Sequence, residues 1–94
     1  MKNDKIDEDK LNKYIVLTDK ALKEAIKHIN KAKIKEAEKI IEMASCYLSD
    51  AKYFKVKEDF VNAFACINYA HGWLDCGARL GIFNVKDRRM FTIK

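Results

Sequence analysis

The chain has 94 residues, of which 49% are hydrophobic and 35% charged, with no proline and three glycines. This balance excludes a disordered chain and a membrane-spanning protein, argues against a β fold with many tight turns, and favours one soluble, all-α domain. The formal net charge of +5 comes from 19 Lys and Arg against 14 Asp and Glu, so an anionic partner has to be considered.

Apolar residues at seven-residue spacing predict three helices, over about residues 4–29, 34–56 and 60–81. Asp4 is the expected N-cap of the first helix, and Asp59 is the expected N-cap of the third. The apolar phase breaks between Ile29 and Ala37, which predicts a turn over residues 30–33. This turn holds no Gly or Pro, so one continuous, kinked helix is the alternative. The third helix is expected to end near Gly81, a residue type typical of the C′ position.

Small residues recur along the second and third helices. Because the predicted link between these helices is short, they should be antiparallel neighbours, and two small-residue seams would let them approach closely. The seams comprise Ala37, Ala44 and Ala51 on the second helix and Ala63, Ala70 and Gly77 on the third. The sequence therefore predicts an up-down-up three-helix bundle.

The third helix is apolar almost all the way round, so a second face should be covered by something. This face carries Ala65, Tyr69, Trp73, Cys76 and Leu80. Other helices, a partner subunit or the tail over residues 82–94 could cover it. We expect the tail to pack back on the bundle, because Met90, Phe91 and Ile93 are too apolar for a solvated end.

Three cysteines stand at positions 46, 66 and 76, with no C-x-x-C spacing. An odd number of cysteines and no apolar signal segment after Met1 predict reduced thiols in a cytoplasmic protein, without a disulfide framework or a metal site.

A polar row lies between the two apolar faces of the third helix. It consists of Asn68, His71, Asp75 and Arg79. Spacings of three and four residues place these side chains in line. The simpler interpretation is a hydrogen-bonded seam at the edge of the core. The alternative is a small pocket in which Asp75 orients His71 as a base or metal ligand and Arg79 holds an anion. One histidine and one carboxylate fall short of a metal set or a catalytic motif, so no enzyme, cofactor or metal is expected.

Lysines gather at the end of the first helix and the start of the second. They are Lys20, Lys23, Lys27, Lys31, Lys33 and Lys35, opposed in that stretch only by Glu24. This basic face could neutralise phosphates, but it lacks arginine and interleaved aromatic residues, so a solvated lysine surface is the simpler interpretation.

A resemblance to a known family is carried by residues 50–54, by residues 59–65 and above all by NYAHGWLDCGARLGIF over residues 68–83. These segments resemble an archaeal family of small helical proteins known as domain of unknown function 357. It covers residues 35–83 well and implies a three-helix bundle in an archaeal cytoplasm, without an established activity. Glu58 departs from the pattern, because relatives tend to carry Gly at this helix end.

These observations favour a non-enzymatic protein-interaction or accessory module over an enzyme. Tyr69, Trp73 and Leu80 would form the interaction face, because aromatic residues are common at binding hot spots. The partner would be another protein or a second copy of the chain. The alternative function is nucleic-acid binding through the face from Lys20 to Lys35.

Overall fold

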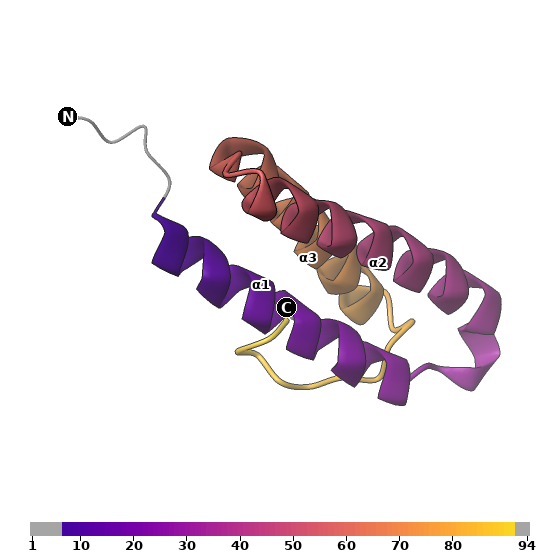
Figure 1. The fold of residues 1–94 in the computed structure, drawn as a ribbon. Helices are drawn as coiled ribbons and strands as arrows, with labels where there is room; N and C mark the ends of the chain where they lie inside the picture. Colours follow the sequence, from indigo (N-terminus) through magenta and orange to yellow (C-terminus); the bar gives the residue numbers. More distant parts are fainter. Residues whose placement is uncertain (1–6, 92–94) are drawn as a thin grey trace.

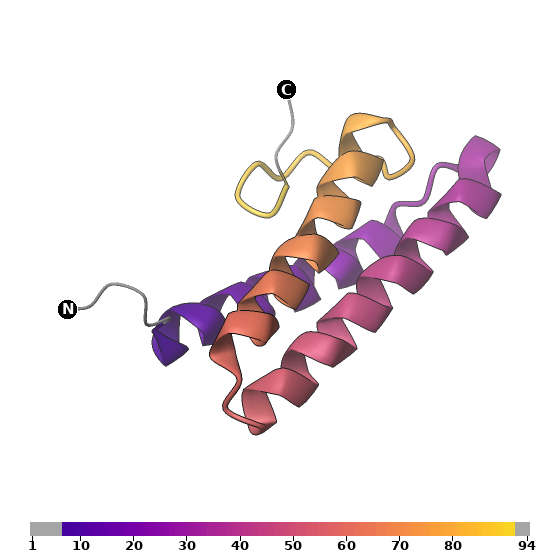
Figure 2. The same ribbon diagram turned by 90° about the horizontal axis from the view of Figure 1, so that it is seen from above.

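The computed structural model describes residues 7–91 and confirms the predicted all-α, up-down-up three-helix bundle (Figure 1). The helices are α1 (Glu8–Lys27), α2 (Ile34–Val56) and α3 (Phe60–Arg79), and a short 3-10 turn, η1 (Lys31–Lys33), precedes α2. Figure 2 shows α2 and α3 running side by side in opposite directions, while the axis of α1 crosses them at an angle. The α2–α3 pair has the most extensive packing.

Two of the three helices begin at an aspartate cap. Asp7 precedes α1, and its carboxylate accepts a hydrogen bond from the backbone N–H of Asp9 (2.9 Å). The predicted cap, Asp4, lies outside the described residues. Asp59 caps α3 as expected, because its carboxylate accepts from the backbone N–H of Asn62 (3.2 Å). Such caps satisfy N–H groups that have no partner inside the helix.

The two small-residue seams meet in the core between α2 and α3. Every alanine in both seams is at most 1% exposed, and Gly77 is buried with them. Small side chains let the two backbones approach closely, and larger side chains fill the space toward α1. The largest of these are Leu11, Ile67 and Leu74, all at most 1% exposed.

Both helices of this pair end in the same backbone motif. After α2, the N–H of Asp59 donates to Phe54 C=O (2.9 Å) and that of Glu58 donates to Lys55 C=O (2.9 Å). After α3, the N–H of Ile82 donates to Gly77 C=O (2.8 Å) and that of Gly81 to Ala78 C=O (3.3 Å). This Schellman motif needs a left-handed C′ residue. Gly81 adopts φ 73° at no steric cost, whereas Glu58 adopts φ 59° with a side chain present.

The segment after α3 turns back onto the bundle, as predicted, and pairs with the α1–α2 connection. The Asn30 N–H donates to Ile82 C=O (2.9 Å), and the Asn84 N–H donates to His28 C=O (2.7 Å). The Asn30 side chain also donates to Gly81 C=O (2.9 Å). These bonds fix the chain direction after α3, so that Phe83 and Phe91 become buried at 1% and 2% exposure.

Phe83 fills the space that Gly77 leaves on α3. A Cβ atom at Gly77 would lie 2.6 Å from Phe83 Cδ2, well inside contact distance, and 3.3 Å from Ile40 Cδ1. Within the described chain the second face of α3 is covered only in part, since Trp73 is half-buried against the core whereas Tyr69 and Leu80 are each 62% exposed. The hydrogen bonds to residues 28–30 hold the returning chain at the α1–α2 connection instead.

Candidate functional site

The four residues of the polar row of α3 differ in how deeply they are buried. His71 and Asp75 are half-buried in its middle, and Asn68 and Arg79 are exposed at its ends. His71 Nε2 lies 3.7 Å from Asp75 Oδ1. Among the ion pairs of residues 7–91, this is the one that joins two members of the row. Arg79 is the last residue of α3. The row therefore places one imidazole beside one carboxylate, with Arg79 at the edge.

The buried end of this pair reaches across to α1. His71 Nδ1 and the Thr18 hydroxyl oxygen form a hydrogen bond of 2.9 Å. Thr18 is only 1% exposed, and a buried hydroxyl without a partner would be costly. Thr18 is not among the candidate site residues predicted from the sequence. The available signal was the hydroxyl of Thr18 among the apolar residues that face inward from the first helix. A buried hydroxyl in such surroundings requires a polar partner from a neighbouring helix.

The connection from Thr18 through His71 to Asp75 has the order of a nucleophile, base and orienting acid, but it lacks their geometry. The hydroxyl is closed off from solvent, and 3.7 Å is longer than a hydrogen bond. The adjoining hollow has a volume of about 200 Å³, below the usual range for small-molecule sites of roughly 300–1,000 Å³. Its lining combines Tyr14, Leu17 and Thr18 of α1 with Ile67, Asn68, His71, Gly72 and Asp75 of α3. The arrangement holds α1 to α3.

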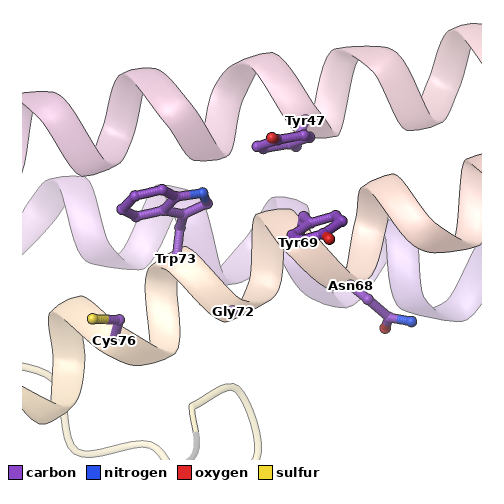
Figure 3. A pocket seen from close by; sticks show the side chains of 6 residues that line it. All are labelled: Tyr47, Asn68, Tyr69, Gly72, Trp73 and Cys76. Atoms are coloured by element: carbon purple, nitrogen blue, oxygen red, sulfur yellow. The ribbon is translucent and has the colours of Figure 1, made fainter.

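A larger hollow lies on the surface of α3 beside Tyr47 of α2, and Figure 3 shows the side chains that line it. It has a volume of about 360 Å³ and is lined by Tyr47, Asn68, Tyr69, Gly72, Trp73 and Cys76. The rings of Tyr47 and Tyr69 stack with centroids 5.3 Å apart and an angle of 24° between their planes. Trp73 is half-buried beside them. Tyr47 is not among the interaction residues predicted from the sequence, which are Tyr69, Trp73 and Leu80.

Gly72 stands between the two hollows and belongs to both linings. A Cβ atom at this position would meet no atom within 4 Å, so no neighbouring group requires a glycine here. Glycine in a helix interior costs about 1 kcal/mol relative to alanine. The surface of α3 therefore has a low point at Gly72, and no packing contact within residues 7–91 requires a glycine there.

The exposed surface of α3 differs in charge from those of α1 and α2. Seven of the ten exposed residues of α1 are charged, whereas α3 has one charged residue, Arg79, among eight exposed ones. We call the uncharged strip the outer face of α3. It comprises Val61, Ala65, Asn68, Tyr69, Gly72 and Cys76, and Leu80 extends it just beyond the helix.

The predicted basic face runs from the second half of α1 into the start of α2. Lys20, Lys23, Lys27, Lys31 and Lys35 are exposed, and Lys33 is half-buried. Acidic groups interrupt it, because Asp19 lies 3.0 Å from Lys23 Nζ and 3.9 Å from Lys52 Nζ. Glu24 likewise contacts His28 at 3.1 Å. The face is thus less uniformly positive than its lysine count indicates.

The cysteines differ in environment, and residues 7–91 bring no metal set together. Burial raises the pKa of the half-buried Cys66 thiol, and the nearby Asp50 carboxylate raises it further. Cys46 and Cys76 are exposed. Within these residues no group of three or more His, Cys, Asp or Glu could hold a metal ion, and no helix is long and apolar enough to cross a bilayer.

Comparison with known proteins identifies the family of the chain. Neither curated proteins nor solved structures give a significant match. A family model, described as "Protein of unknown function (DUF357)", matches residues 13–83. This match includes most of α1. The resemblance noted from the sequence was close only over residues 35–83. The chain therefore belongs to the DUF357 family of proteins of unknown function.

Proposed function

We propose that this protein is a non-enzymatic interaction module whose protein partner docks on the outer face of α3. The single observation that carries the proposal is that Arg79, at the end of the helix, is the one charged residue among the exposed residues of α3, whereas more than half of the exposed residues of α1 and of α2 are charged. Covering the outer face would remove Tyr69, Val61 and Leu80, each more than 60% exposed, from water. Arg79, at the end of the helix, is the one exposed charged residue of α3 next to this contact.

The aromatic hollow beside this face supports the same proposal. Tyr69 is held by stacking on Tyr47, so its ring is ordered before a partner arrives. A pre-ordered aromatic ring loses little conformational freedom on binding, which is why such residues dominate interface energetics. Trp73 and Gly72 give the hollow an apolar wall and an open floor.

Nucleic-acid binding through the basic face is the alternative function. Lys20 and Lys27 are available for phosphates, but Asp19 and Glu24 carry negative charge on the same helix. Phosphate contacts supply most of the affinity of nonspecific binding, so interleaved carboxylates weaken it. The alternative predicts binding that falls steeply with salt.

Tagged recovery from cells of the source organism distinguishes these functions. Three forms are compared, each with and without nuclease: the unaltered chain, Tyr69→Lys, and Lys20→Glu with Lys27→Glu as a charge-reversal control on α1. We expect the same protein partner with the unaltered chain and the α1 variant after nuclease treatment, and its loss with Tyr69→Lys. If the recovered partner is lost after nuclease treatment or with the α1 variant, but is retained with Tyr69→Lys, the result would instead support nucleic-acid binding.

A further inference from the structure

We infer that the partner on the outer face of α3 is a second copy of this chain, bound through α3 helices that cross antiparallel at Gly72. This inference rests on the proposed function and specifies its partner.

Charge determines which surface of a copy can face this one. A helix bearing charged groups would have to desolvate them against the uncharged outer face. In residues 7–91, the exposed surfaces of α1 and α2 each carry seven charged residues, and that of α3 carries only Arg79. Two copies with a net charge of +5 each also repel through their lysine surfaces. The outer face of α3 is therefore the surface on which copies can meet with least electrostatic cost.

Shape makes this face complementary to itself. Gly72 forms a low point on the surface of α3, and Tyr69, a residue that is 62% exposed, lies about one turn away. A twofold axis at Gly72 lets the two backbones approach closely at the low point. The ring of each Tyr69 then lies over the partner helix on the far side of the axis. Twofold dimers are the commonest oligomers, and they need a self-complementary surface of this kind.

The relative direction of the two α3 helices follows from the charged residues near the end of the outer face, Asp75 and Arg79. With parallel helices, each Arg79 would lie against the partner's Arg79, and each Asp75 against the partner's Asp75. With antiparallel helices, Arg79 lies seven residues from the axis, about 10 Å at 1.5 Å per residue, so the two guanidinium groups are roughly 20 Å apart. Salt at physiological strength screens charges at that separation, since the Debye length is about 8 Å.

Sedimentation measures the association. One helix face buries less than the roughly 800 Å² per partner of a standard interface, so we expect a dissociation constant in the micromolar range. Gly72→Leu puts a large side chain on the axis of both copies and should weaken association at least about tenfold. It should leave the fold intact, because the position is open and leucine favours a helix. Association should hold or tighten between about 0.05 M and about 0.5 M NaCl, whereas binding to a polyanion would weaken.

Cross-linking tests the direction. In a Cys46→Ser, Cys66→Ala background, Asn68→Cys is combined with the natural Cys76, because residues four before and four after Gly72 face each other only in the antiparallel pair. The matched controls are Cys76 alone and Lys20→Cys with Cys76. We expect rapid disulfide dimers only with the Asn68→Cys form. Equally rapid dimers of Cys76 alone would overturn the antiparallel arrangement.

The two proposals fail in different ways. A chain that sediments as a monomer up to millimolar concentration and forms no cross-links overturns the second-copy inference. The proposed function then stands or falls separately, on whether Tyr69→Lys loses a protein partner that the α1 variant retains.

Discussion

Two glycines on α3, five residues apart, have opposite surroundings. A side chain at Gly77 would collide with the ring of Phe83, so the fold requires glycine at that position. A side chain at Gly72 would meet nothing within 4 Å, so the isolated chain has no such requirement. The comparison shows that one face of α3 is determined by internal packing, while its outer face is left available for a partner.

The largest effect is expected on the packed side, at Phe83. Removing this ring, which is 1% exposed, leaves a cavity beside Gly77, so Phe83→Ala should lower the free energy of unfolding by about 3–5 kcal/mol. Urea denaturation followed by far-UV circular dichroism measures the change. A loss below about 1 kcal/mol would mean that the returning segment contributes little to the core.

Gly77→Ala should destabilise the fold by about 1–3 kcal/mol, because the added methyl group displaces the Phe83 ring. The double variant with Phe83→Ala provides the control. Once the ring is gone, the added methyl group should cost much less than in the unaltered chain. Fully additive effects of the two substitutions would show that the ring and the glycine do not interact.

Gly72→Ala should have the opposite sign and stabilise the fold by about 1 kcal/mol, because alanine favours a helix and the position is open. The same denaturation measurement, made at low protein concentration to avoid association, checks it. Destabilisation comparable to that of Gly77→Ala would remove the contrast between the two glycines.

A similar contrast exists between the C-termini of α2 and α3, where Glu58 and Gly81 occupy equivalent positions. Because Glu58 has a left-handed backbone, Glu58→Gly should raise the free energy of unfolding, by up to about 1 kcal/mol. Glu58→Ala is the control, since it removes the carboxylate but keeps the Cβ atom. Equal stabilisation by both substitutions would attribute the effect to charge and not to backbone conformation.

The smallest effect concerns two thiols of α3, Cys66 on its packed side and Cys76 on its outer face. The raised pKa of Cys66 leaves less of its reactive thiolate at a given pH, so alkylation should be slower than at the exposed Cys76 and should accelerate only at higher pH. Iodoacetamide labelling of single-cysteine variants across pH 7–10, the range around the ordinary thiol pKa of about 8.5, measures both rates. A faster reaction at Cys66 would contradict its burial.

Features of the fold that depend on periodicity were predictable from the sequence. Seven-residue spacing indicated three helices, and the alanine seams indicated which pair would pack most closely. Asp59 marked the start of α3 through its capping chemistry. Each of these signals lies within one helix or between helices joined by a short turn, so local pattern and propensity are sufficient to read it.

Features that depend on contacts across the chain were not predictable. The hydrogen bonds of residues 28–30 with residues 81–84 join segments without periodic pattern, and they decide where Phe83 lies. The same holds for the pairing of Thr18 with His71 and of Tyr47 with Tyr69, whose partners are set by the relative rotation of helices. Tyr69 and Trp73 were predicted from the sequence as part of an interaction face, but the path of the tail, which decides how far that face stays open, was not predictable.

The most direct test of the central claim is a dilution series followed by amide chemical shifts in NMR. If copies meet on the outer face of α3, the shifts of Ala65, Tyr69, Gly72 and Cys76 should change with concentration, and those of Lys20 and Lys27 should stay constant. Shifts that do not depend on concentration, or changes centred on the α1 lysines, would contradict it.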